Sequence, residues 1–148
     1  MTKVLMVCLG NICRSPLAEG ILKSKVDTTK VQVDSAGTAG YHAGNPPDPR
    51  SIATALQHGI DISAQRSRKL LAKDLEEFDH IFVMDRSNLA DTQALAHTSE
   101  QRNKISLLLN SNQNGSKEVP DPYYGGVSGF EKVYHMIDEA CESIARKI

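Results

Sequence analysis

The chain has 148 residues, of which 40% are hydrophobic and 24% are charged, and its formal net charge is −1. This length suits one domain, residues 1–148, with a core that buries most of the surface of the unfolded chain. A charge close to zero excludes the broad basic field that attracts nucleic acid or an anionic membrane, so any affinity for anions must come from a local site.

The start of the chain and its cysteines bear on the compartment. The first seven residues hold an apolar run that is too short for a signal peptide. The sequence contains no run of 18 apolar residues, which is about the length needed to span a membrane. The three cysteines, Cys8, Cys13 and Cys141, do not form the even framework of a secreted disulfide protein. We therefore expect a cytoplasmic protein with free thiols and with no membrane or nucleic-acid partner.

Strand-like and helix-like segments alternate along the chain, a pattern typical of a parallel sheet covered by helices. The apolar run Lys3–Val7 predicts the first strand, and Pro16–Lys25 predicts a helix that begins with proline. Val31–Val33 predicts the second strand. The glycine- and proline-rich residues 36–47 predict an ordered surface loop, and Asp48–Gly59 predicts a helix that aspartate caps and glycine ends.

The second half of the chain continues the alternation. Leu70–Glu77 predicts a short helix before a third strand at His80–Met84. Ser87–Leu95 predicts a helix and Ile105–Leu108 a fourth strand, followed by the turn-rich residues 110–129. An apolar stripe at helical spacing predicts the last helix, with Phe130, Val133, Tyr134, Ile137, Cys141, Ile144 and Ile148. These elements predict an α/β fold, a three-layer α/β/α sandwich.

The segment between the first strand and the first helix carries the clearest chemical signal. In open parallel sheets, the carboxyl ends of strands and the N-termini of helices meet there to form a ligand site. A loop that enters a helix directs unpaired N–H groups and the positive end of the helix dipole at one point. After Cys8, a phosphate-binding loop is therefore predicted from Leu9, Gly10, Asn11, Ile12, Cys13, Arg14 and Ser15.

Each residue type in this loop has a chemical reason. The N–H donors favour the thiolate of Cys8, and the thiolate is the nucleophile. Ser15 can donate a hydrogen bond to that sulfur, and the planar fork of Arg14 can hold two phosphoryl oxygens. The amides and Arg14 then stabilise the charge of a transferring phosphoryl group. The alternatives are a buried structural cysteine and half of a metal site. No second Cys or His pair stands at zinc-ligand spacing, so we expect no metal and no cofactor.

When a phosphoryl group is taken from an aryl phosphate, the departing phenolate needs a proton, and Asp121 is the predicted general acid that supplies it. It lies between two prolines that stiffen its loop, and this loop follows the fourth strand, so it can return to the sheet edge that holds the cysteine. The alternative is an Asx-type turn, because Asp-Pro commonly opens turns. The cysteine loop favours the catalytic interpretation.

With both motifs in hand, the chain resembles the low-molecular-weight protein-tyrosine phosphatases over nearly its whole length. The resemblance is carried by the segments Val7–Pro16, Asp34–Thr38, Pro47–Arg50, Met84–Leu89 and Asp121–Tyr124. It implies a four-stranded parallel sheet with helices on both faces and a two-step phosphocysteine mechanism without metal. In that mechanism Cys8 is the nucleophile, Arg14 binds phosphate, and Asp121 acts first as acid and then as base.

The resemblance also implies supporting roles. Ser15 supports the loop, and Asn11 and Ser35 resemble the polar pair that holds its strained shape. Cys13 resembles the neighbour that forms a reversible disulfide with the nucleophile. Gln65 stands where many eukaryotic members have a histidine that supports the loop. Arg68 is expected to brace the site, and a solvated basic face is the alternative.

Three tyrosines are expected at the rim of the cleft, where they would stack against a phenyl ring: Tyr41, Tyr123 and Tyr124. Core packing is the alternative for any one of them. A deep aromatic slot would let the phosphate of phosphotyrosine reach Cys8, whereas the shorter phosphoserine side chain would not reach it. The expected partners are phosphotyrosine-containing proteins, with inorganic phosphate as product and competitive ligand, and the chain is expected to be a monomer or weak dimer.

Three other functions compete with this interpretation. An arsenate reductase of related fold needs further cysteines as a disulfide relay, yet Cys141 falls in the apolar stripe of the last helix. Arginine phosphatases of this kind carry Thr where Ile12 stands and Phe, not Tyr, after Asp-Pro. A non-catalytic phosphotyrosine-binding module would keep Arg14 but would need neither Cys8 nor Asp121.

Overall fold

The fold is built on one parallel sheet, and the computed structural model describes residues 1–111, 118–123 and 127–148. Its strands lie in the order β2-β1-β3-β4 and comprise β1 (Thr2–Cys8), β2 (Val31–Gly37), β3 (His80–Val83) and β4 (Ile105–Leu107). The central strand β1 pairs in parallel with β2 and β3. Residues 4–7 of β1 are fully buried, as is typical of a strand covered by helices on both faces.

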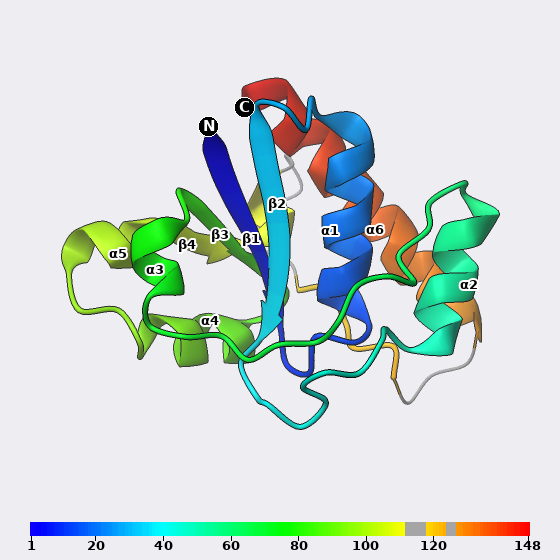
Figure 1. Cartoon of the computed structure of the whole chain (residues 1–148), viewed down its shortest axis with the longest axis horizontal. Helices are drawn as coiled ribbons and strands as arrows, with labels where there is room; N and C mark the ends of the chain where they lie inside the picture. The colour runs from blue at the N-terminus through cyan, green and yellow to red at the C-terminus, as the bar shows by residue number, and fades with distance from the viewer. Residues whose placement is uncertain (112–117, 124–126) are drawn as a thin grey trace.

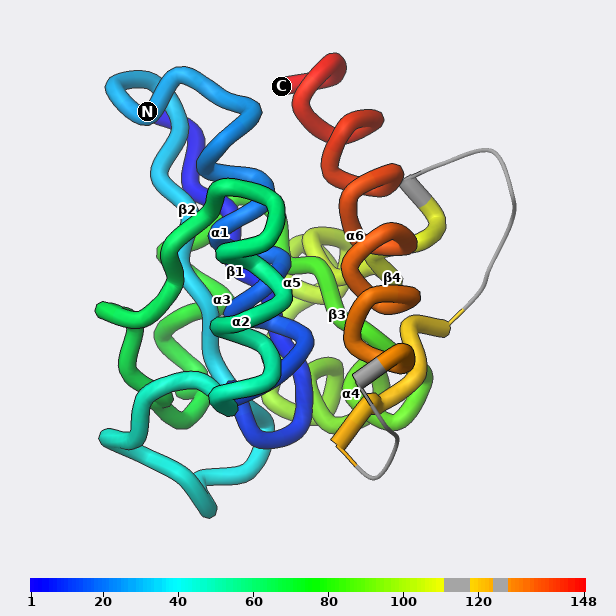
Figure 2. The backbone as a smooth tube through the Cα atoms, turned by 90° about the vertical axis from the view of Figure 1, so that its right-hand side faces the viewer, coloured from blue at the N-terminus to red at the C-terminus, as the bar shows by residue number. Residues whose placement is uncertain are grey.

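Helices cover both faces of the sheet (Figure 1). They are α1 (Arg14–Lys25), α2 (Pro49–Gln57), α3 (Asp74–Glu77), α4 (Arg86–Gln93), α5 (Ser99–Asn103) and α6 (Val127–Lys147), with a 3₁₀ turn η1 (Leu108–Ser111) after β4. Figure 2 shows α1, α2 and α6 in front of the sheet, and α3, α4 and α5 lie on its other side. The expected three-layer sandwich with a four-stranded parallel sheet is confirmed.

Two apolar cores follow from the alternation of side chains along β1. Val4, Met6 and Cys8 pack on the side of α1 and α6, whereas Leu5 and Val7 pack on the side of α3 and α4. The predicted stripe of α6 is buried apart from the terminal residue Ile148, which is 38% exposed, and its residues from Val133 to Ile144 belong to the first core. The stripe prediction is therefore confirmed except at the helix end.

Some element boundaries differ from the expectation. β2 runs on to Gly37 because its polar residues Asp34 and Ser35 still pair with β1. α3 starts at Asp74 and not at Leu70, because the Leu70 N–H donates to the Gly37 carbonyl and holds that segment against the end of β2. The unexpected helix α5 is capped by Thr98, whose hydroxyl accepts from the Gln101 N–H.

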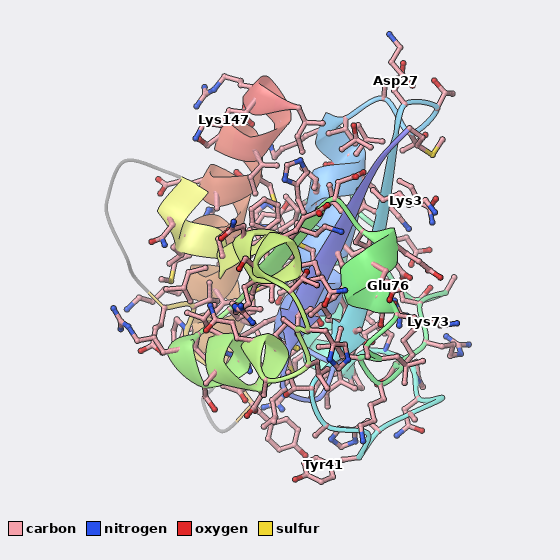
Figure 3. The ribbon with its side chains drawn as sticks, turned by 90° about the vertical axis from the view of Figure 1, so that its left-hand side faces the viewer. Lys3, Asp27, Tyr41, Lys73, Glu76 and Lys147 are labelled. Carbon is pink, nitrogen blue, oxygen red and sulfur yellow. The ribbon has the colours of Figure 1, made fainter. Side chains whose placement is uncertain are left out.

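The strands all point their carboxyl ends toward one end of the molecule. Figure 3 shows Tyr41 at this end, with Lys3, Asp27 and Lys147 toward the opposite end. The helix α2 also begins here, and Asp48 caps it as predicted by accepting from the Arg50 N–H. Within the described ranges, the longest helices are not apolar enough to cross a membrane.

Candidate active site

The loop after β1 folds around the sulfur of Cys8. Cys8 is the last residue of β1 and Arg14 the first of α1, so the loop spans one strand end and one helix start. The Asn11 N–H donates to Cys8 Sγ at 3.3 Å, and Ser15 Oγ lies 3.0 Å from the same sulfur. The structure thus places Cys8, the loop and Ser15 together, as the sequence predicts.

Asn11 holds the shape of this loop. Its φ of 56° lies in the left-handed region, which costs a non-glycine residue roughly 1–2 kcal/mol. Its side-chain amide donates to Ser15 Oγ at 2.7 Å and to Ser35 Oγ at 3.0 Å, and its Oδ1 accepts from the Arg68 N–H at 3.0 Å. Three bonds from one buried side chain offset the strain.

The direction of these bonds bears on the sulfur. Because Asn11 donates to Ser15 Oγ, the single hydroxyl hydrogen of Ser15 is free to point at Cys8 Sγ. At the other end, Ser35 Oγ donates to Glu19 Oε1 at 2.6 Å. Hydrogen-bond donors therefore face Cys8 Sγ. Sequence reasoning missed Glu19, although it lies one helical turn after Ser15 on the same face of α1.

Arg14 is held by residues that lie far from it in the sequence. Its guanidinium donates to Asp85 Oδ2 at 2.7 Å and to the Val119 carbonyl at 2.9 Å. Burial lowers the pKa of Arg14, but the nearby Cys8 and the hydrogen bond to Asp85 outweigh it, so the pKa lies above its ordinary value. Asp85 was given no role by the sequence analysis. Its place directly after β3 and before α4 is the signal that could have found it.

Asp121 lies at the mouth of the pocket. Its Oδ2 is 3.6 Å from the Arg14 guanidinium, and its side chain is 38% exposed. Its Oδ1 accepts from the Tyr123 N–H at 3.0 Å, so the Asx-type turn is formed as well. The turn and the acid position do not compete, because the turn uses Oδ1 and Oδ2 faces the pocket.

The pocket has a volume of about 210 Å³ and joins the loop to its rim. Its lining comprises Cys8, Leu9, Gly10, Ile12, Cys13, Arg14, Tyr41, His42, Asp121 and Tyr123. Tyr41 is 79% exposed and Tyr123 40% exposed, so neither is a core residue. Tyr124 lies outside the described residues.

The other two cysteines differ from Cys8 in their surroundings. Burial, with the charges of Asp48 and Cys8, raises the pKa of Cys13 to about 12, so Cys13 stays a neutral thiol. Burial also raises the pKa of Cys141, a residue of α6 that is fully buried. All three cysteines are free.

Gln65 and Arg68, from the segment after α2, contact the loop that follows β1 and the start of α1. Gln65 donates to the Pro16 carbonyl at 3.1 Å, so it contacts the first turn of α1. The Arg68 side chain pairs with Asp34 and Asp74 at 3.1 and 3.0 Å. The backbone N–H of Arg68 also donates to Asn11 Oδ1, so Arg68 makes the contacts expected of a residue that braces the loop.

The parts that meet at this pocket are those of a cysteine-dependent phosphatase. A thiol faces N–H and O–H donors, a fixed guanidinium stands beside it, and a carboxyl group lies within reach of a leaving group. The described residues around this pocket offer no set of metal ligands. This combination suits transfer of a phosphoryl group to sulfur.

Comparison with known proteins identifies the family. The family model for low molecular weight phosphotyrosine protein phosphatase matches residues 3–148. The human low molecular weight phosphotyrosine protein phosphatase is 40% identical, over 97% of this chain and 94% of the human one. A protein tyrosine phosphatase from Entamoeba histolytica superposes with a TM-score of 0.93 at 37% identity, over 99% of this chain and 96% of that chain. Wzb of Vibrio vulnificus, solved with benzylphosphonate, gives a TM-score of 0.89 at 32% identity, over 99% of each chain. The chain belongs to the low molecular weight phosphotyrosine protein phosphatase family.

Proposed function

We propose that this protein hydrolyses phosphotyrosine in proteins through a phosphocysteine intermediate on Cys8. The observation that carries the proposal is the environment of the sulfur, which receives the Asn11 N–H and lies within hydrogen-bond distance of the Ser15 hydroxyl. Arg14 and Asp121 line the same pocket. Family membership supports the reaction class, and the geometry supports the assignment of roles.

In the first step the Cys8 thiolate attacks phosphorus and displaces the tyrosyl oxygen. Arg14 and the loop amides bind the equatorial oxygens, on which the charge of the transition state is spread. Asp121, at the pocket mouth, gives its proton to the departing phenolate. The products of this step are free tyrosine hydroxyl and phosphocysteine.

In the second step water hydrolyses the phosphocysteine. Asp121, now ionised, takes a proton from the attacking water, and Cys8 leaves as a thiolate. The Ser15 hydroxyl, 3.0 Å from the sulfur, stabilises the charge that returns to it. Inorganic phosphate is the second product and, because it fits the same loop, a competitive ligand.

The preference for tyrosine is assigned to the rim. Tyr41 and Tyr123 line the pocket opening and offer aromatic faces to a phenyl ring. The relative from Vibrio vulnificus was solved with benzylphosphonate, a compound with an aromatic ring next to its phosphonate. By similarity, an aromatic phosphate suits the pocket of this chain better than an aliphatic one.

The rival reactions make different demands. An arsenate reductase would relay a disulfide through further thiols, whereas Cys141 is fully buried and its raised pKa keeps it neutral. An arginine phosphatase of this kind would share the loop but would carry Thr in place of Ile12 and Phe in place of Tyr123. A binding module would have no use for Cys8 facing hydrogen-bond donors.

The test compares turnover of phosphotyrosine, phosphoserine and phosphoarginine peptides and of arsenate by one purified sample. We expect hydrolysis of phosphotyrosine to exceed the others clearly. The variant Cys8→Ser should bind phosphate but turn over no substrate, because the amides and Arg14 remain. Preference for phosphoarginine or arsenate, or normal turnover by Cys8→Ser, would overturn the proposal.

We also propose Cys13 as the redox partner of Cys8. Peroxide would convert the Cys8 thiol to sulfenic acid and water, and the Cys13 thiol would then displace water from it to form a disulfide. Both thiols line one pocket. After peroxide, a reductant should restore activity to the wild type but not to Cys13→Ser, each compared with its own untreated sample. Equal recovery would remove this role.

Four further assignments complete the proposal. We assign residues 1–148 to a single phosphatase domain that acts in the cytoplasm as a monomer or weak dimer. Its partners are phosphotyrosine-containing proteins. The free cysteines support a reducing compartment.

A further inference from the structure

Two histidines and a glutamate converge where the end of α2 meets α6. His58 follows the last residue of α2, and Glu131 and His135 are one turn apart on α6. The Nε2 atoms of His58 and His135 lie 2.7 and 3.1 Å from the same oxygen, Glu131 Oε1. One ligand atom from each residue lies within 4.8 Å of the other two. Figures 1 and 2 show α2 and α6 as neighbouring helices on the same face of the sheet.

The rings are held in place by their neighbours. The His58 ring stacks on Tyr134 at 3.9 Å with an interplanar angle of 9°, and it meets the His135 ring edge-on at 5.6 Å. Glu131 and His135 are fixed relative to each other by their i, i+4 spacing on a helix. The three ligand atoms therefore lie within 4.8 Å of one another before any ion arrives, which lowers the cost of binding.

We propose that His58, Glu131 and His135 bind a transition-metal ion of the Zn²⁺ type. Imidazole nitrogen and carboxylate oxygen are ligands that zinc accepts at about 2.0–2.2 Å, which sets neighbouring tetrahedral ligands roughly 3.3 Å apart. The present separations of 2.7 and 3.1 Å are close to that value. A water molecule completes the coordination.

The ion would replace the two contacts to Glu131 Oε1. Each ring now directs its Nε2 proton at Glu131 Oε1. On binding, Nε2 would give up that proton to water and Nδ1 would carry one instead, so the neutral imidazole presents its Nε2 lone pair to the metal. Side-chain exposures of 28%, 38% and 64% for His58, Glu131 and His135 leave the ion a path from solvent. None of the three residues lines the phosphate pocket.

The test is a titration with Zn²⁺ in the Cys8→Ser variant, which removes the competing thiolate of the phosphate loop. We expect one ion per chain by calorimetry. At 100 times the dissociation constant, the melting temperature should rise by about 5–10 °C. His135→Ala removes a mostly exposed ligand. Glu131→Gln keeps the shape of the Glu131 side chain but removes its negative charge. Each change, made in the same background, should weaken binding at least tenfold.

His97→Ala is the matched control because its exposed ring belongs to the segment before α5, on the other side of the sheet. It should bind Zn²⁺ as the Cys8→Ser parent does. Circular dichroism of the metal-free variants shows whether each is folded. No binding by the parent, or equal binding by His135→Ala and the parent, would overturn the metal site and leave an ion-pair cluster. Neither result would touch the phosphatase proposal.

Discussion

Arg14 shows how one residue depends on contacts from distant parts of the chain. Asp85 and the Val119 carbonyl hold one terminal nitrogen, NH1, while the other, NH2, lies near Asp121. The Arg14 side chain is 3% exposed, so its guanidinium is fixed in position before phosphate binds. A planar fork that is already oriented loses little entropy when it grips two oxygens.

Asp85→Asn should therefore lower kcat/KM for phosphotyrosine about 10- to 100-fold, because a charge-assisted hydrogen bond to a buried guanidinium is worth roughly 1.5–3 kcal/mol. Phosphate binding should weaken as well. Asp91→Asn, an exposed carboxylate on the same helix α4, is the control and should be unchanged. If the two variants have the same kcat/KM, Asp85 does not position Arg14.

Asp121→Asn should slow phosphotyrosine hydrolysis about 10²- to 10⁴-fold. The loss should shrink for an aryl phosphate whose leaving phenolate is a weak base, such as p-nitrophenolate, since that group needs less protonation. Steady-state rates with a series of phenols measure the effect. An equal loss across the series would remove Asp121 as the acid.

The cysteines should differ in reactivity with pH. Because burial raises the pKa of Cys13 to about 12, its thiolate fraction is small near neutral pH and grows tenfold per unit as the pH rises toward 12. Iodoacetamide at about pH 7 should label Cys8 alone, as seen by peptide mass spectrometry, and denaturant should expose all three. Labelling of folded Cys13 as fast as Cys8 would contradict this environment.

At this scale the sequence predicts the residues of local motifs better than their distant partners. Cys8, Arg14 and Ser15 are close in the chain, and a strand before them and a helix after them predict their convergence. Asp85 lies 71 residues from Arg14, so its contact depends on the order of strands. That order follows from packing and is not visible in spacing alone.

At the scale of elements, the site depends on how the end of β2 supports the loop after β1. The loop backbone passes so close to Gly37 that an added Cβ would lie 2.8 Å from the Leu9 carbonyl and 3.1 Å from the Asn11 nitrogen. The Gly37 N–H and carbonyl both bond to the segment after α2. The glycine thus allows three segments to meet.

Gly37→Ala should destabilise the protein by about 1–3 kcal/mol and weaken phosphate binding, because rigid backbone atoms would have to move. Urea unfolding and a phosphate titration measure the two effects. Gly40→Ala is the control, since the nearest atom to its Cβ is 3.4 Å away on the flexible Lys69 side chain. If both variants behave alike, the close approach at Gly37 has no part in shaping the loop.

Strands and long helices are the elements that sequence predicts most reliably here. All four strands were expected because their β-forming runs are bounded by turns. The short helix α5 and the extension of β2 were not, because α5 has five residues and no apolar periodicity, and β2 continues through polar residues that pair with β1. Both depend on tertiary contacts.

For the whole molecule, the near-neutral charge fits a site that attracts anions by local geometry. The loop amides and Arg14 gather at the carboxyl end of the sheet, while the rest of the surface carries no matching excess of positive charge. The sheet order puts β1 between β2 and β3, so helices cover the strand that ends at Cys8 on both faces.

The most direct measurement of the central claim is an acid quench during turnover of an aryl phosphate, followed by mass mapping of the chain. Asp121→Asn lacks the base for the second step, and it is tested with p-nitrophenyl phosphate, whose leaving group needs little acid in the first step. A phosphoryl group should then accumulate on the peptide that contains Cys8, and none should form in Cys8→Ser. Absence of a phosphoryl adduct in Asp121→Asn, or its attachment to any residue other than Cys8, would contradict the proposed mechanism.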